Sequence, residues 1–148
     1  MHCNVTKHPT SAWVTQQLRE AFPFDSAPGY LIFDRATNFS GEVIETVKSF
    51  GIQPKRTGFR SPWQNGVAER WVGSCRRDLL DHVIVLNERH LKRLMNEYVD
   101  YYHEDRTHLA LVKGTPAGRE AADLAESGRS ILTMPRFGGL HHRYDLAA

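Results

Sequence analysis

Apolar positions follow two different spacings along the first part of the chain. A recurrence every three to four residues predicts helices over 14–22 and 43–50. Between them, the continuous apolar run over 30–33 predicts a short buried strand. Segments 3–6 and 52–59 are interpreted as further short strands. The order strand, helix, strand, helix, strand favours an α/β layered fold.

The second half of the chain is mainly helical by the same criterion. A long helix is predicted up to about Val85, and Asn87 is expected to cap the next helix, whose apolar stripe covers 91–102. Segment 115–116, a threonine followed by proline, predicts the start of a short helix because proline is favoured at the first helical position. The chain is expected to close with a β-hairpin around the glycines at 138–139.

Composition places the chain among ordinary folded domains. Of its 148 residues, 41% are hydrophobic and 24% are charged, which fits one domain and excludes a disordered chain, a collagen and a coiled-coil rod. No stretch approaches the roughly 18 apolar residues of a membrane span, and the N-terminus lacks the apolar core of a signal peptide. We therefore expect a cytoplasmic protein without membrane contact. Cys3 and Cys75 form no zinc or redox motif.

Charge is unevenly distributed although the net charge is only +2. Segment 48–77 carries seven Lys or Arg residues against one acidic residue, whereas residues 1–47 carry three basic residues against five acidic ones. A polarised surface of this kind favours a polyanionic partner such as DNA. On charge alone, a solvated helix face explains the pattern equally well.

Two carboxylates stand at positions where α/β folds place their sites. Asp34 follows the strand predicted over 30–33, and Glu69 lies in the first turn of the long helix. We expect the two side chains to face each other across the edge of the sheet, where they would suit Mg²⁺ or Mn²⁺. The alternative for Glu69 is that it only complements the positive end of the helix dipole.

Arginines follow Glu69 along the same helix. Seven helical residues bring Arg76 to within about 20° of Glu69 around the axis, and Arg70 and Arg77 repeat this relation one step further round. An acid at the helix start with arginines behind it forms a plausible track for a phosphodiester backbone. Ordinary solvent exposure remains the alternative for these arginines.

Two segments resemble the second and third acidic motifs of the integrase-core transposases of insertion-sequence type. Residues 31–39 read LIFDRATNF, and residues 60–70 read RSPWQNGVAER, which is the more specific of the two. Segments 101–108 and 115–116 are similar to the region that follows the core in this family. The resemblance covers roughly residues 1–120.

The resemblance implies a ribonuclease-H-like fold and an Asp-Asp-Glu triad that binds two divalent metal ions for DNA cleavage and strand transfer. Asp34 would be the second acid and Glu69 the third, with Mg²⁺ or Mn²⁺ as the cofactor. The partners would be DNA and further copies of the chain in a homo-oligomer. The DNA contacts predicted from charge, loop position and resemblance are Lys55, Arg56, Arg60, Trp63, Asn65, Arg70, Arg76 and Arg77.

The first acid of such a triad is expected on a strand before residue 3. We therefore interpret the chain as N-terminally truncated, with a partial catalytic core over 1–86 and, over 87–148, a helical extension and tail of the same domain. With one acid of the triad absent, the chain alone is expected to be inactive. Two alternatives stay open: a nucleic-acid-binding module without catalysis, and a decayed transposase remnant.

Overall fold

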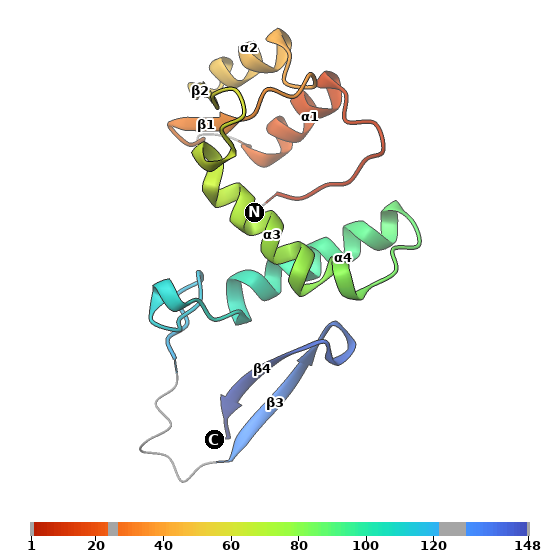
Figure 1. The fold of residues 1–148 in the computed structure, drawn as a ribbon, viewed down its shortest axis with the longest axis vertical. Helices are drawn as coiled ribbons and strands as arrows, with labels where there is room; N and C mark the ends of the chain where they lie inside the picture. The colour runs from red at the N-terminus through yellow and green to blue at the C-terminus, as the bar shows by residue number, and fades with distance from the viewer. Residues whose placement is uncertain (1, 24–26, 122–129, 148) are drawn as a thin grey trace. The chain divides into compact units, whose positions relative to one another are not determined.

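The computed structural model describes residues 2–23, 27–121 and 130–147 (Figure 1). The chain divides into two compact units, Met1–Ile84 and Val85–Ala148, and each is described by itself. None of the helices in the described ranges has the length and apolar character that crossing a membrane requires.

The first unit begins with a helix and a strand at the positions that the apolar pattern predicts. Helix α1 (Ser11–Ala21) begins where the side-chain oxygen of Thr10 accepts a hydrogen bond from the backbone N–H of Trp13 at 3.2 Å. Strand β1 (Tyr30–Phe33) buries Phe33 and ends one residue before Asp34. These two predictions are confirmed.

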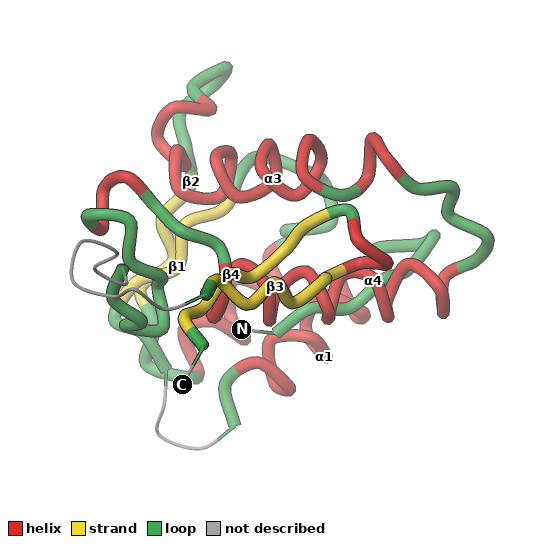
Figure 2. Tube along the Cα trace, turned by 90° about the horizontal axis from the view of Figure 1, so that it is seen from below, coloured by secondary structure: helices red, strands yellow, loops and turns green. Residues whose placement is uncertain are grey.

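Helix α2 (Gly41–Ser49) connects β1 to β2 (Gln53–Arg56), and the two strands pair in parallel (Figure 2). The helix stops before Gly51, whose φ of 75° is a conformation that suits glycine. The apolar faces of α1 and α2 pack together, with Val14, Val43, Val47 and Ile52 buried at the centre. The predicted strand over 52–59 is thus present but shorter.

Helix α3 (Gly66–Asp78) follows a turn of 3₁₀ helix, η1 (Pro62–Asn65). The helix was expected to continue to about Val85 but ends seven residues earlier, and the short η2 (Leu80–His82) comes next. Side chains beyond the end of the helix explain the early stop. His82 Nε2 donates to the carbonyl oxygen of Arg77 at 2.9 Å, so this carbonyl needs no further helical turn.

The N-terminal segment is not the strand predicted over 3–6, because none of these residues has strand structure. Side-chain hydrogen bonds attach the segment to α1 instead. Asn4 Nδ2 donates to Gln17 Oε1 at 2.9 Å, and His2 Nε2 donates to the same oxygen at 2.8 Å. The Asn4 carboxamide also accepts from the backbone N–H of Val5 at 3.0 Å, which is a local alternative to strand pairing.

The second unit is built around helix α4 (Glu88–Asp100), which Asn87 caps by accepting from the backbone N–H of His90 at 2.9 Å, as predicted. The helix buries Leu94, Tyr98 and Val99. It continues as one turn of π-helix, η3 (Tyr101–Asp105), and a 3₁₀ turn follows at η4 (Leu109–Leu111).

The helix predicted to start at Thr115 and Pro116 is wrong within the described part of the chain. The Thr115 backbone carbonyl accepts from the N–H of Gly118 at 2.9 Å, and the Thr115 hydroxyl accepts from the N–H of Arg119 at 3.1 Å. The segment is therefore a tight turn, and Gly118 has the φ of 91° that closes it. Residues 122–129, over which such a helix could have continued, lie outside the described residues.

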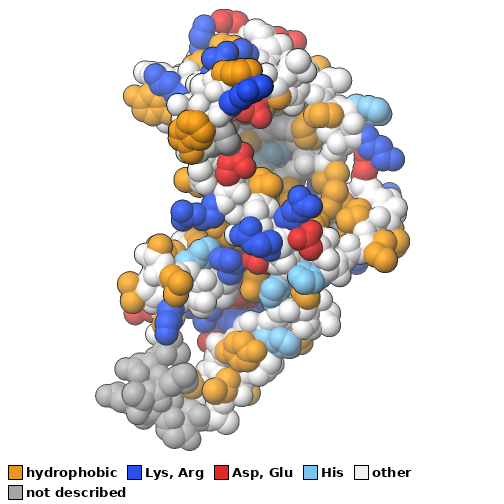
Figure 3. All heavy atoms as spheres, in the orientation of Figure 1, with side chains coloured by type: hydrophobic (Ala, Val, Ile, Leu, Met, Phe, Trp, Pro, Cys, Tyr) orange, Lys and Arg blue, Asp and Glu red, His pale blue; other side chains and the backbone are white. Residues whose placement is uncertain are grey.

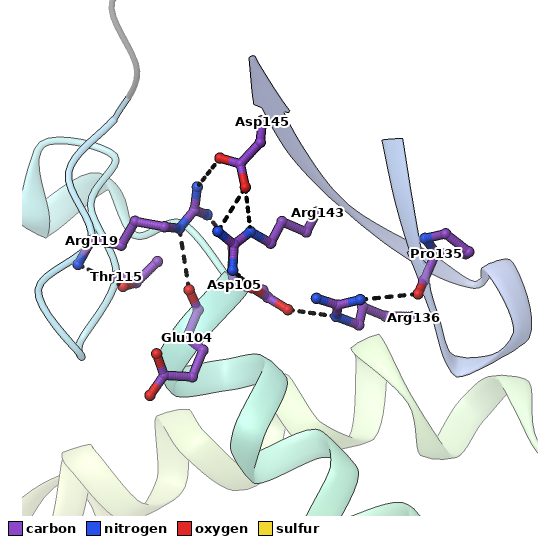
Figure 4. A network of polar contacts seen from close by, with 8 residues as sticks. All are labelled: Glu104, Asp105, Thr115, Arg119, Pro135, Arg136, Arg143 and Asp145. Carbon is purple, nitrogen blue, oxygen red and sulfur yellow. Dashed lines mark hydrogen bonds and ion pairs between the residues drawn. The ribbon is translucent and has the colours of Figure 1, made fainter. Parts of the chain in front are cut away.

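The predicted closing hairpin is confirmed as strands β3 (Ile131–Arg136) and β4 (His141–Leu146), paired antiparallel through a turn that contains Gly138 and Gly139. A polar network attaches this hairpin to the end of η3 (Figure 4). The buried carboxylate of Asp105 accepts from Arg136 Nε at 2.6 Å and from Arg143 Nη1 at 3.3 Å.

Candidate functional site

The carboxyl ends of β1 and β2 meet at one edge of the parallel sheet. The pairing of the strands extends past their ends, since the backbone N–H of Thr57 donates to the carbonyl of Phe33 at 3.0 Å. Arg35 Nε donates to the carbonyl of Thr57 at 3.1 Å and so connects the segments that follow the two strands. Asp34 lies directly before this connection and is exposed.

The carboxylate of Asp34 has a local hydrogen bond that orients it. Its Oδ1 atom accepts from the backbone N–H of Ala36 at 2.9 Å, which is an Asx turn after the strand. One carboxylate oxygen is thus held by the backbone at a solvent-exposed sheet edge.

The loop of residues 57–65 runs from the end of β2 to the start of α3, and its own side chains hold its shape. Gln64 Oε1 accepts from the backbone N–H of Gly58 at 2.6 Å, and Ser61 Oγ donates to the carbonyl of Phe59 at 3.1 Å. A Cβ atom at Gly58 would lie 3.1 Å from Ser61 Oγ, which is a close contact. The 57–65 loop is therefore a defined structure.

Glu69 lies in the first turn of α3, as predicted, with an exposed side chain. Asn65 occupies the position before the helix, and its side chain makes no capping hydrogen bond. Glu69 and Asp34 belong to the same compact unit, on either side of the 57–65 loop in the chain. Their pairing across the sheet edge stays a prediction. Across residues 2–23, 27–121 and 130–147, no three His, Cys, Asp or Glu side chains form a group that could hold a metal ion.

Three of the predicted DNA-contacting cations lie over aromatic rings. Lys55 Nζ is 5.4 Å from the ring centre of Tyr30, and the guanidinium carbons of Arg56 and Arg60 are 5.7 Å and 5.1 Å from the ring centres of Phe33 and Phe59. Arg56 also donates to the carbonyl of Phe39. Arg56 is therefore partly engaged in holding its own unit together, although it is exposed.

The arginines of α3 are all exposed but differ in their surroundings. Arg76 forms an ion pair with Asp81 at 3.3 Å, which neutralises part of its charge. Arg70 and Arg77 are paired with no carboxylate in the described residues. Figure 3 shows Lys and Arg side chains gathered over α3 and β2 on one face of this unit. Arg70 and Arg77 are thus the α3 cations most available to an external anion.

Two side chains of the 57–65 loop are large, aromatic and exposed. Trp63, a predicted DNA contact, keeps 73% of its surface exposed, and Phe59 keeps 74%. Phe59, Arg35 and Gln64 were not singled out from the sequence as functional residues. The two segments that resemble the family contain Arg35 and Gln64, so these motifs were the available signal for both residues. The contact that Arg35 makes with Thr57 is tertiary, and no local pattern reveals it.

Cys75 lies on the buried face of α3. Burial first, and the nearby Cys3 and Asp78 second, raise the pKa of this thiol from 9.0 to about 11. A neutral, buried thiol is a poor nucleophile and a poor metal ligand. Cys75 is therefore excluded from the candidate site.

Comparison with known proteins identifies the region that contains the 57–65 loop and α3. Residues 50–116 match the model of the integrase core domain family. Over 77 residues the chain is 29% identical to the putative transposase InsD for insertion element IS2E of Escherichia coli (strain K12), covering 52% of this chain and 35% of that protein. It has the same identity to the transposase InsD for insertion element IS2A/D/F/H/I/K of Escherichia coli, over 26% of the length of that protein. The aligned part thus spans about a third or less of these relatives.

Among solved structures, the chain is similar to one chain in the cryo-EM structure of the simian T-cell lymphotropic virus intasome in complex with PP2A regulatory subunit B56 gamma. The TM-score is 0.58 at 17% sequence identity, over 97% of this chain and 54% of that chain. At this identity the similarity concerns the fold, which is the ribonuclease-H-like integrase fold with mixed helices and strands. The three comparisons agree: residues 50–116 are similar to the integrase core domain, and the chain is similar to transposases of insertion elements over 77 residues.

Proposed function

We propose that this chain supplies part of a transposase catalytic core that acts on DNA, with Asp34 and Glu69 as its two acids. The observation that carries this proposal is the joined edge of the sheet, where Arg35 connects the ends of both strands directly after Asp34. Sites of open α/β sheets lie at the carboxyl ends of the strands. The 57–65 loop leads from this edge to α3, whose first turn carries Glu69.

The donor chemistry at these positions fits Mg²⁺ or Mn²⁺. Asp34 and Glu69 provide hard carboxylate oxygens, and both side chains are exposed. When bound, a divalent ion polarises the reacting phosphate and stabilises the attacking and leaving oxygens. The protein's contribution is to orient the carboxylates, and the hydrogen bond from the Ala36 N–H to Asp34 does this for one of them.

The cations of this unit would hold the DNA strand beside these acids. Arg70 and Arg77 carry the least compensated charge on α3, and Lys55 and Arg60 extend the basic surface to β2 and the 57–65 loop. Contacts of this kind are made to phosphate groups and tolerate many sequences. Assembly of further copies of the chain with DNA is part of the proposal.

A second candidate is a DNA-binding module that performs no catalysis. The observation that favours it is the absence, among the described residues, of a third acidic or imidazole side chain beside the other two. Two-metal phosphoryl transfer needs ligands that fix both ions. The basic surface would then keep its role, and Asp34 and Glu69 would not need to bind metal together.

Metal binding to matched variants tests the proposal and separates these two functions. Isothermal titration with Mn²⁺ is expected to give weak binding that Asp34→Asn and Glu69→Gln each remove. Glu42→Gln is the control, because Glu42 is an exposed acid in the first turn of α2 and thus matches Glu69 in position. Loss of binding in only one of the two variants would contradict a shared metal site. DNA binding without Mn²⁺ binding would favour the second candidate.

A further inference from the structure

The two faces of the β3–β4 hairpin differ in charge. Because side chains alternate across a strand, the register of the pair assigns six residues to one face. This face, called the outer face below, consists of three cross-strand pairs: Ile131 with Leu146, Thr133 with Tyr144, and Pro135 with His142. It carries no Lys, Arg, Asp or Glu. The opposite, inner face carries Arg136, Arg143 and Asp145, on the side of the hairpin that faces Asp105 (Figure 4).

This arrangement is the reverse of the usual one, in which an antiparallel sheet turns its apolar face inward and its charged face to water. Ion pairs to Asp105, and a stack of His141 on Tyr101 with ring centres 5.0 Å apart, hold the inner face. On the outer face, Ile131 is 57% exposed and Tyr144 is 58% exposed. The outer face is therefore an uncharged sheet surface that its own unit leaves largely uncovered.

The side chains of the outer face form one continuous surface. Directly opposed residues of an antiparallel pair have Cβ atoms about 4.5–5.5 Å apart, so Thr133 and Tyr144 are neighbours at its centre. Along β4, the ring centres of His142 and Tyr144 are 6.1 Å apart. Apolar sheet faces are normally covered by a second layer, which lies about 10 Å away when that layer is another sheet. The hairpin thus supplies one layer of such a packing.

The lack of charge on the outer face indicates which kind of layer covers it. A nucleic-acid backbone needs cations opposite its phosphates, and the six side chains include no Lys or Arg. An identical face can lie opposite without bringing like charges together. A two-fold pair of one chain brings the same patch of both copies into contact. A second copy of this hairpin therefore matches the outer face in charge, in flatness and in length.

We propose that the outer face of the hairpin is the contact between two copies of this chain, packed face to face about a two-fold axis. This inference rests on the proposed function in one respect, namely that further copies of the chain assemble. It adds which surface joins two copies, and it requires neither DNA nor metal. Six side chains per copy are fewer than the about 20–30 residues per side of a stable interface, so the dissociation constant of the dimer is expected to be on the order of 100 μM.

Analytical ultracentrifugation of the full chain, without DNA or metal, measures the dimer at concentrations below and above the expected dissociation constant. The Ile131→Thr/Tyr144→Thr double variant removes two large side chains from the outer face and keeps residues that favour strands. It is expected to raise the dissociation constant about tenfold or more. Leu132→Thr is the matched control, because Leu132 is 50% exposed in the same strand but lies on the inner face. It is expected to leave the dissociation constant unchanged.

Cysteine cross-linking locates the contact independently. In a Cys3→Ser background, Thr133→Cys places a thiol at the centre of the outer face, and Leu132→Cys places one on the inner face. A short bismaleimide is expected to join two chains of the Thr133→Cys variant and to leave the Leu132→Cys variant monomeric. Circular dichroism checks that each variant is folded.

A chain that stays monomeric at every concentration overturns the proposal, and so does a dimer that the double variant leaves unchanged. A dimer that Leu132→Thr weakens equally, or equal cross-linking of the two cysteine variants, places the contact elsewhere and also overturns it. A monomer in which the Thr133→Cys thiol reacts with maleimide far more slowly than the Leu132→Cys thiol would show that another part of the chain covers the outer face instead. DNA binding by the first unit is measured separately, so failure of the dimer and failure of the proposed function are distinguishable.

Discussion

Replacing Asp105 by asparagine should release the β3–β4 hairpin from the rest of its unit. The Asp105 carboxylate is the common acceptor for Arg136 and Arg143, one residue from each strand (Figure 4). Asparagine has nearly the same shape but lacks the charge, and its amide group would place N–H donors against a guanidinium. Arg136 and Arg143 would then lose the negative charge of the carboxylate that both of them contact.

The size of the effect follows from the burial of the three side chains. Removing one partner of a fully buried ion pair costs about 3–5 kcal/mol. Here the Asp105 side chain is only 5% exposed, whereas those of Arg136 and Arg143 are 35% and 31% exposed and can regain water. We therefore expect Asp105→Asn to lower the free energy of unfolding of this unit by about 2 kcal/mol, below the range for a fully buried pair.

Asp145→Asn is the control for this prediction. Asp145 also pairs with Arg143, at 2.6 Å, and its hydrogen bond raises the pKa of that guanidinium, but its side chain is 31% exposed. A pair of this exposure is worth less than about 1 kcal/mol. The contact between Arg119 Nη2 and the Asp105 carbonyl at 3.0 Å involves the backbone, so the Asp105 variant keeps it.

Hydrogen exchange followed by mass spectrometry measures the effect where it is expected. Amides of β3 and β4 should exchange faster in Asp105→Asn, because an isolated two-stranded hairpin is marginally stable, while amides of α1 and α2 should keep the wild-type rate. Equal protection of the hairpin in the Asp105 and Asp145 variants would refute the reasoning, and so would an effect spread evenly over both units.

Further predictions concern the first unit. The Arg70→Ala/Arg77→Ala double variant should bind unrelated DNA duplexes more weakly, by a similar factor for each, and should reduce the slope of log affinity against log salt by about 2. Arg19→Ala, in the last turn of α1, is the control. An unchanged slope in the double variant would contradict DNA contacts from α3. At pH 8, iodoacetamide should modify Cys3 and spare Cys75, because a pKa of about 11 leaves the Cys75 thiol protonated. Cys75 should become reactive only as the pH approaches 11 or when the unit unfolds. Peptide mass spectrometry that finds Cys75 modified at pH 8 would contradict this prediction. The 148-residue chain is expected not to nick or join DNA with Mg²⁺ or Mn²⁺, because the described residues bring no group of three metal-binding side chains together. Products that disappear in Glu69→Gln would show that prediction to be wrong.

Local patterns predicted those parts of the fold in which neighbouring residues decide the structure. The apolar run before Asp34 forms a strand, and the cap at Asn87 begins a helix, because each depends on only a few consecutive residues. The end of α3 was missed because it depends on a side chain, His82, that returns to the backbone of Arg77. A pattern of apolar spacing does not contain that contact.

In the candidate site, too, the sequence predicts the residues that a local pattern marks and misses the contacts between distant residues. Asp34 and Glu69 could be proposed from their position in elements and from the motif that contains Glu69. The connection from Arg35 to Thr57 could not, since it joins residues 22 positions apart. The Asp105 network was likewise invisible, with partners 31 and 38 positions away. Contacts at such separation become evident only once the chain has folded.

The helical crossover between β1 and β2 also constrains the order in which the first unit folds. Tyr30 cannot pair with Gln53 until the intervening segment is closed, and that closure costs entropy before any strand contact compensates for it. Val47 and Ile52 are close in the sequence, so they can pack together early in folding. This contact shortens the segment that must still be closed and so lowers the entropy cost of pairing the strands. The edge that holds Asp34 should therefore form after α2, with φ-values high at Val47 and low at Thr57; a high value at Thr57 would contradict this order. A nascent chain would thus complete its hydrophobic interior before it presents its acidic edge.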